Sequence, residues 1–137
     1  QACDSPKPLL LKIAPDLSDS QLDDILEVAE ITGLDGLIAT NTTLSRAGLR
    51  TPATRVDAIG NGGLSGAPLS SRAQEVIEYL HQKSGGRIAL IGVGGIMQPK
   101  DALDRLTGGA SLVQVYTGFV YAGPGFVRRI LRTLAGH

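Results

Sequence analysis

Four short apolar stretches recur along the chain, separated by segments in which apolar and polar residues alternate at helical spacing. The stretches lie near residues 8–13, 36–40, 87–92 and 111–116, and three of them are almost continuously apolar. Such runs are typical of parallel strands that are covered on both faces. The pattern therefore predicts four buried strands of one sheet.

The segments between these stretches predict amphipathic helices. Ser18 and Gln21 stand at the spacing of a capping box, an apolar stripe follows them, and Gly33 supplies a C-terminal stop. Proline suits the first turn of a helix, because an N–H at that position would have no hydrogen-bond partner within the helix, so its loss costs nothing. We expect four helices, which begin near Ser18, at Ser70 or Ser71, near Pro99 and near Pro124.

Strict alternation of strands and helices predicts a parallel sheet with helices outside it. An open doubly wound sheet and a (β/α)8 barrel both fit this order. Four strands are half of such a barrel, which needs about 250 residues. The only methionine is Met97, so the sequence does not begin with methionine. We expect residues 1–137 to be the C-terminal half of an α/β barrel, a (β/α)8 TIM barrel, with 1–7 as a polar lead-in.

Composition narrows the class of protein. Apolar residues make up 42% of the chain and charged residues 19%, and thirteen basic residues balance thirteen acidic ones. This balance predicts no nucleic-acid partner. Cys3 is the only cysteine, which rules out a disulfide within the chain. The sequence contains neither an apolar run of about 18 residues nor metal-ligand spacing, so we expect no membrane-spanning helix and no metal site.

Polar residues near the ends of the first two strands are candidates for ligand binding, because ligands bind at the carboxyl ends of parallel strands. Lys12 lies inside an otherwise apolar strand. A buried lysine needs a negative partner, which predicts either a buried ion pair or an anionic cofactor beside it. The run "TNTT" at 40–43 offers three hydroxyls and an amide, which would suit a planar polar substrate or form a hydrogen-bonded turn.

The turn "GVGG" at 92–95 departs from a dinucleotide-binding fingerprint. Met97 stands where a small residue is needed, and no carboxylate follows about 20 positions on. In barrels the loops after the last two strands often bind phosphate, and glycines leave backbone N–H groups free to face it. "GVGG" and "YTG" at 116–118 therefore predict a phosphate cradle, to which the following helix adds its dipole.

Five motifs in order resemble the C-terminal half of the dihydroorotate dehydrogenase family: "LKIAPDL", "GLIATNTT", "GGLSGAPL", "LIGVGGI" and "GASLVQVYTG". The resemblance covers nearly the whole chain from about Pro8. "KIAPDL", "NTT" and "YTG" are similar to the membrane-associated, quinone-linked class. The part that matches least well is the loop 44–61.

The resemblance implies an FMN-dependent enzyme that oxidises dihydroorotate to orotate in pyrimidine (UMP) synthesis and passes the electrons to a quinone. It implies a peripheral protein on the cytoplasmic side of a membrane. Asn41 and Thr42 would hold the orotate ring, and Lys12 would stabilise charge on the flavin during reduction. The implied FMN contacts are Lys12, Thr40, Ser65, Gly66, Gly94, Gly95, Tyr116 and Thr117.

The family's catalytic base is a serine on the first half of the barrel, and no serine of this chain lies in a matching motif. We therefore expect the base, the quinone contacts and the remaining FMN contacts in an N-terminal half of the barrel, without which 1–137 would be inactive. Two other functions stay open: another FMN- or phosphate-binding barrel enzyme, and a half-barrel that binds a ligand or partner without catalysis.

Overall fold

The computed structural model describes residues 7–136, so Cys3, His137 and nearly all of the polar lead-in lie outside the described residues. The four expected strands form one sheet in the order β1-β2-β3-β4, and each neighbouring pair is parallel. The prediction of a parallel sheet is confirmed. The strands are β1 (Leu10–Ile13), β2 (Gly36–Ala39), β3 (Ala89–Val93) and β4 (Leu112–Gln114).

The four expected helices are also present. The capping box is confirmed, because the N–H of Gln21 donates to Ser18 Oγ at 3.3 Å and the N–H of Ser18 donates to Gln21 Oε1 at 2.9 Å. Gly33 ends that helix in the left-handed region, at φ 68°. Pro99 opens its helix as expected, whereas Pro124 lies one residue before its helix. The helices are α1 (Asp19–Thr32), α3 (Ser70–Ser84), α4 (Pro99–Thr107) and α6 (Gly125–Ala135).

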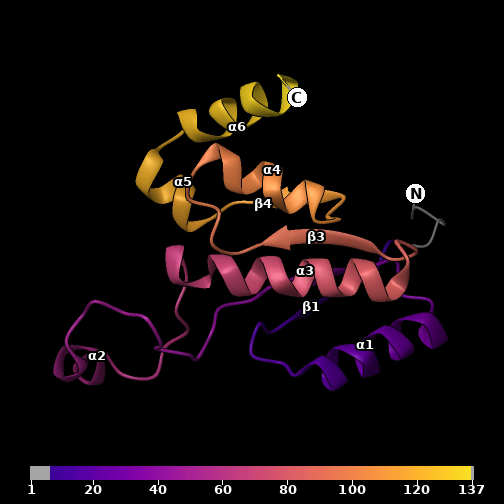
Figure 1. Ribbon diagram of the computed structural model, residues 1–137, viewed down its shortest axis with the longest axis horizontal. Coiled ribbons are helices and arrows are strands. Elements are labelled where there is room, and N and C mark those ends of the chain that lie inside the picture. Colours follow the sequence, from indigo (N-terminus) through magenta and orange to yellow (C-terminus); the bar gives the residue numbers. More distant parts are fainter. Residues whose placement is uncertain (1–6, 137) are drawn as a thin grey trace, which may run out of the picture.

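The structure adds three short elements that the sequence pattern did not predict. Helix α2 (Ala53–Ile59) lies within the long connection after β2, and the 3-10 helix η1 (Ala67–Leu69) leads into α3. Helix α5 (Thr117–Ala122) follows β4 directly. Figure 1 shows α2 projecting away from the sheet, and none of its residues is buried. A helix without a buried stripe leaves no periodic apolar signal in the sequence.

The core lies on one face of the sheet. Leu37 and Leu90 of the central strands are fully buried, and they pack in one cluster with residues of α1 and α3. A second cluster joins α4 and α6 through Ala102, Phe126 and Ile130. Figure 1 shows α3 running along the sheet, with α4 and α6 stacked beyond β3 and β4.

The opposite face of the sheet is open among the described residues. The strand register places Lys12, Ile38, Ile91 and Leu112 in one row across the four strands. None of these four side chains is fully buried, and Leu112 is 62% exposed. Within the described residues helices thus cover one face of the sheet, although the apolar runs are typical of strands covered on both faces. Only the outer face receives helices, and the inner face has no facing layer among residues 7–136.

Candidate functional site

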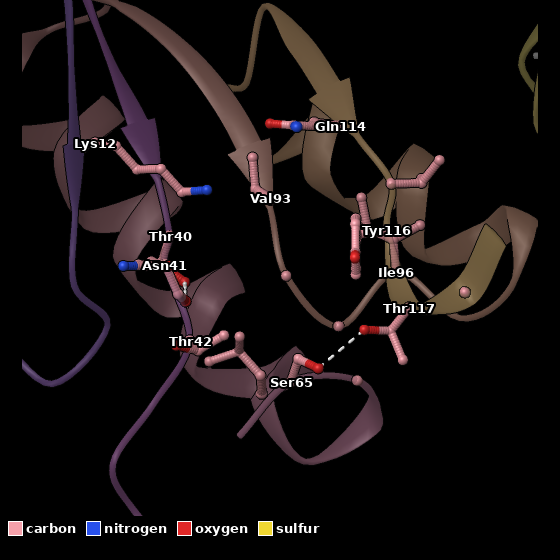
Figure 2. A pocket seen from close by; sticks show the side chains of 16 residues that line it. Lys12, Thr40, Asn41, Thr42, Ser65, Val93, Ile96, Gln114, Tyr116 and Thr117 are labelled. Carbon is pink, nitrogen blue, oxygen red and sulfur yellow. Dashed lines mark hydrogen bonds between the residues drawn. The ribbon is translucent and has the colours of Figure 1, made fainter. Parts of the chain in front are cut away.

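A pocket of about 190 Å³ lies at the carboxyl ends of the strands (Figure 2). All ten residues singled out in the sequence as cofactor or substrate contacts line it, although they come from five separate segments of the chain. The structure thus brings the predicted residues together. They are Lys12, Thr40, Asn41, Thr42, Ser65, Gly66, Gly94, Gly95, Tyr116 and Thr117.

Lys12 extends from β1 into this pocket (Figure 2). The expectation of burial is wrong: the side chain is exposed, because it stands on the open face of the sheet. It makes no ion pair with another residue of the described range 7–136. The alternative of a buried ion pair therefore finds no support, and the ammonium group remains available to an anionic ligand.

The segment after β2 is held by backbone hydrogen bonds on both sides. The N–H of Thr40 donates to the carbonyl of Val93 at 2.8 Å, and the N–H of Asn41 donates to the carbonyl of Ile13 at 2.7 Å. The Thr40 side chain is buried, and its hydroxyl donates to the Asn41 carbonyl at 3.0 Å. The side chains of Asn41 and Thr42 are exposed at the pocket. A rigid backbone therefore presents an amide and a hydroxyl to the pocket.

The glycine turn after β3 packs against the start of α3. Gly94 and Gly95 have φ values of 104° and 70°, in the region that favours glycine. A Cβ at Gly94 would lie 2.8 Å from Leu69 Cδ2, and a Cβ at Gly95 would overlap the backbone of Ser70. Both positions therefore require glycine, for conformation and for space.

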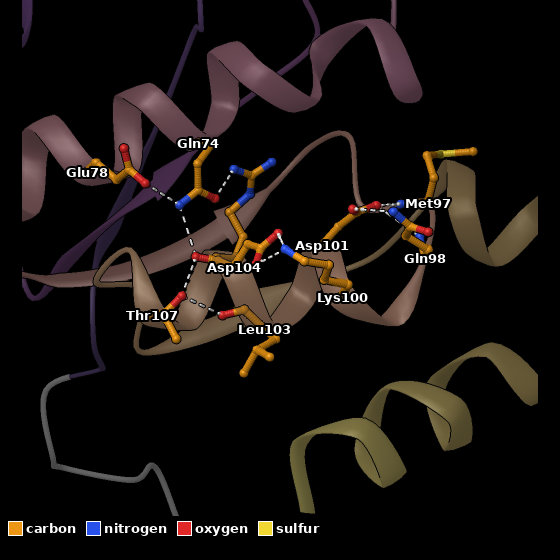
Figure 3. Close-up of polar contacts among 10 residues, drawn as sticks. Gln74, Glu78, Met97, Gln98, Lys100, Asp101, Leu103, Asp104 and Thr107 are labelled. Atoms are coloured by element: carbon orange, nitrogen blue, oxygen red, sulfur yellow. Dashed lines mark hydrogen bonds and ion pairs between the residues drawn. The ribbon is translucent and has the colours of Figure 1, made fainter. Parts of the chain in front are cut away.

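The helix that follows this turn contributes less than the sequence predicted. The Asp101 carboxylate accepts hydrogen bonds from the N–H groups of Met97 at 2.8 Å and Gln98 at 3.0 Å (Figure 3). These amides at the start of α4 already have a partner, and the acidic cap offsets the positive end of the helix dipole. The N–H groups of Gly94 and Gly95 make no hydrogen bond to another described residue, so the glycine turn still offers donors to an anion.

Two loops meet at the mouth of the pocket. Thr117 Oγ1 donates to Ser65 Oγ at 3.0 Å, which links the start of α5 to the segment before α3 (Figure 2). Gly66 has a φ of 83°, and a Cβ there would lie 3.2 Å from Thr117 Cγ2. Tyr116 also lines the pocket, and it is 76% exposed. This edge of the pocket thus offers hydroxyl groups beside a closely packed glycine.

Sequence reasoning missed some of the lining. Gln114, at the end of β4, lines the pocket on the same face of the sheet as Lys12. Its signal was available, since Gln114 is a polar residue inside an apolar run, as Lys12 is. Leu69, Val93 and Ile96 also line the pocket. Because these three residues are apolar, the sequence alone predicts only that they belong to the core.

Parallel βα units with a glycine-lined pocket at the carboxyl ends of the strands define the class of (β/α)-barrel ligand-binding proteins. Within that class, the family model for dihydroorotate dehydrogenase matches residues 2–137, and the chain belongs to this family. The family is flavin-dependent.

Similar proteins agree with this assignment. The chain is 58% identical to the dihydroorotate dehydrogenase (quinone) of Nocardioides sp. and 55% identical to that of Kineococcus radiotolerans. Each match covers 93% of this chain, but 36% and 35% of the respective relative. The chain thus spans about a third of the length of the curated relatives that it matches.

Solved structures show the same relationship. The crystal structure of the Eimeria tenella enzyme (DHODH) in complex with ferulenol matches with a TM-score of 0.85 and 42% sequence identity. This match covers 96% of the present chain and 35% of the Eimeria tenella chain. The ligand-free form of the same enzyme matches with a TM-score of 0.86. Across residues 7–136 no helix is both long and apolar enough to cross a membrane.

Proposed function

We propose that this chain is the C-terminal half of the barrel domain of a quinone-linked dihydroorotate dehydrogenase, and that it supplies one wall of the FMN and orotate sites. The observation that carries the proposal is the single pocket that joins Lys12, the Asn41 amide and the glycine turn at 94–95. A cation, a planar polar group and free backbone amides are what a flavin phosphate and a pyrimidine carboxylate need.

The pocket fits FMN as a partial site. Gly94 and Gly95 form a turn that a Cβ would fill, and the hydroxyls of Ser65 and Thr117 lie at its edge. These groups would hold the phosphate, and Lys12 would lie beside the ring system. The volume of about 190 Å³ is smaller than the roughly 300–1,000 Å³ of complete ligand pockets. We therefore expect other parts of the full-length protein to enclose the cofactor.

Bound FMN would supply hydride acceptance and onward electron transfer for the oxidation of dihydroorotate to orotate, which also releases a proton. The ammonium group of Lys12 would favour negative charge in the pocket, because opposite charges attract strongly where water is partly excluded. Asn41 and Thr42 would orient the substrate ring through hydrogen bonds, which fixes the reacting carbon relative to the cofactor. We assign no proton-abstracting base to this chain, since none of its serines lies in the matching motif.

The proposal also specifies the electron acceptor, which we take to be a quinone. Its support is the name shared by the Nocardioides and Kineococcus relatives, dihydroorotate dehydrogenase (quinone). We propose that the full-length protein acts at the cytoplasmic surface of a membrane, where a quinone is available, and that the quinone binds outside this chain.

The test is anaerobic reduction of the flavin in the purified full-length protein. Dihydroorotate should bleach the flavin absorbance, and a soluble quinone analogue should restore it, whereas NAD⁺ should not. A protein without flavin, or a flavin that dihydroorotate does not bleach, would refute the proposed activity. Recovery with NAD⁺ and not with the quinone would refute the choice of acceptor alone.

A further inference from the structure

Arg105 is a buried cation without a carboxylate at hydrogen-bond distance. It belongs to α4, and only 1% of it is exposed. Nη1 donates to Gln74 Oε1 at 2.6 Å, and Nη2 donates to the carbonyl oxygens of Ser70 at 3.0 Å and Gly94 at 2.9 Å. Within the described residues Arg105 forms no ion pair, and its Nε is buried without a partner.

Such a group is costly to bury, because a charge loses its hydration and receives only neutral partners in return. Burial lowers the pKa of Arg105 below its usual value, and the carboxylates of Asp101, Glu78 and Asp104 offset only part of this effect. The position is therefore not explained by charge pairing. What its acceptors share is their location, where the start of α3 meets the glycine turn that lines the pocket.

The hydrogen bond to the Gly94 carbonyl decides the direction of an amide. In a trans peptide the C=O and the following N–H point in opposite directions. Because Arg105 holds the Gly94 oxygen on the side of α4, the N–H of Gly95 points to the other side. That N–H makes no hydrogen bond to another residue in the part of the chain that the structure describes, and Gly95 lines the pocket.

The two glycines allow the Gly94–Gly95 peptide to rotate easily, so the direction of the Gly95 N–H is not fixed by the backbone alone. Gly94 and Gly95 both have positive φ values, and glycine crosses between backbone regions more readily than any other residue. Without a donor at Arg105, the Gly94 carbonyl would lose its hydrogen-bond partner, and rotation of the peptide could bring it to another donor. Rotation would turn the Gly95 N–H away from the pocket.

We propose that Arg105 is a positioning residue, which fixes the Gly94–Gly95 peptide so that the Gly95 N–H faces a phosphate bound in the pocket. The inference rests on the proposed function, since FMN is the ligand that would bring the phosphate.

Gln74 completes the arrangement by holding the guanidinium. Its oxygen accepts from Arg105, while its Nε2 donates to the Asp104 carbonyl at 2.9 Å and to Glu78 Oε1 at 2.8 Å (Figure 3). The amide is thus fixed in one orientation by two acceptors. Gln74 therefore restricts Arg105 to the position from which it reaches Gly94.

The test compares FMN with riboflavin, which lacks the phosphate, in the full-length apoprotein. The measured quantity is the ratio of the two dissociation constants, riboflavin over FMN. The variants are Arg105→Met, which keeps the stem and removes the donors, and Arg105→Lys, which keeps the charge. Arg72→Met is the matched control, because Arg72 bridges the carbonyls of Pro15 at 2.9 Å and Leu17 at 2.8 Å and does not line this pocket.

Arg105→Met should lower the ratio about tenfold or more, the loss expected for a hydrogen bond to a charged group, with riboflavin affinity nearly unchanged. Arg105→Lys should give an intermediate ratio, and Arg72→Met the wild-type ratio. A merely structural role would weaken both flavins together and leave the ratio constant.

The outcomes separate the two proposals. A wild-type ratio near one would mean that the pocket does not recognise phosphate, which overturns the proposed function. A high wild-type ratio that Arg105→Met leaves unchanged overturns only the role of Arg105. If Arg105→Met does not fold, the same criterion applies to Arg105→Lys and to Gln74→Leu, which removes the acceptor that holds the guanidinium.

Discussion

Thr117 Oγ1 donates a hydrogen bond to Ser65 Oγ at 3.0 Å, although 52 residues separate them in the sequence. The bond closes one edge of the pocket between the start of α5 and the segment before α3. Ser65 is exposed, so water competes for both hydroxyls in the absence of a ligand.

We predict that this pair couples more strongly when FMN is bound. In a double-mutant cycle of Ser65→Ala and Thr117→Val, the coupling free energy without flavin should be at most about 1 kcal/mol. With FMN it should rise, because both hydroxyls would then share the phosphate. Urea unfolding of the four proteins measures it, and Thr107→Val is the control, since that hydroxyl bonds only to carbonyls of its own helix. Equal coupling with and without FMN would contradict the assigned site.

A second prediction separates close packing from backbone conformation. Gly33→Ala meets no atom within 4 Å, and Gly33 lies in the left-handed region (φ 68°, ψ 38°), so this variant should cost only the left-handed conformation, about 1–2 kcal/mol. Gly95→Ala also places a side chain at a positive φ, of 70°, and its Cβ would overlap the Ser70 backbone, which should add about 1–3 kcal/mol. The free energies of unfolding of the two variants test this. Equal destabilisation would show that Gly95 is not packed as described.

Lys12→Ala should slow flavin reduction by dihydroorotate more than it weakens orotate binding, because the proposed site places this positive charge beside the flavin ring. Stopped-flow reduction at saturating substrate measures the rate, and flavin titration with orotate measures the affinity. Lys100→Ala is the matched control, since Lys100 pairs with Asp104 on α4 and does not line the pocket. An unchanged reduction rate in Lys12→Ala would contradict the assigned role.

Asn41→Ala should weaken orotate binding by roughly 1–3 kcal/mol and leave FMN in place, because polar groups of the ligand lose their partner. Titration of the flavin absorbance with orotate gives the affinity, and the flavin content of the purified variant gives the occupancy. Asn61→Ala controls for loss of an exposed amide elsewhere, since Asn61 does not line the pocket. Loss of FMN from Asn41→Ala would assign Asn41 to the cofactor site instead.

The segment 1–137 expressed alone should be inactive, hold FMN weakly or not at all, and self-associate. Leu11 and Leu112 of the edge strands are 39% and 62% exposed, and the inner face of the sheet has no facing layer in the described structure. Unpaired apolar edges favour association between copies. The mass of the segment in solution tests its self-association, and the flavin retained after purification tests its FMN binding. A monodisperse monomer with stoichiometric FMN would contradict this prediction.

Much of the fold could be predicted from the sequence because the signals are local. The capping box at Ser18 and the stop at Gly33 depend on residues a few positions apart, and both are confirmed. The four apolar runs form four parallel strands, as their composition predicted. Helices α2 and α5 were missed, because each is short and buries almost none of its side chains.

The sequence predicted which residues line the candidate site, but it did not predict how they are arranged. The expected burial of Lys12 was wrong, since an apolar run does not reveal which face of a strand receives helices. The contact of Ser65 with Thr117 depends on two loops that meet only in three dimensions. Arg105 gave no signal at all, because an arginine on a short helix is normally an exposed residue.

The most direct test of the proposed site is a crystal structure of the full-length protein with FMN and orotate. We expect the phosphate at hydrogen-bond distance from the Gly95 N–H, with Lys12 beside the flavin ring. We also expect orotate to contact the side chains of Asn41 and Thr42. A phosphate bound elsewhere, or an orotate that touches neither Asn41 nor Thr42, would contradict this account.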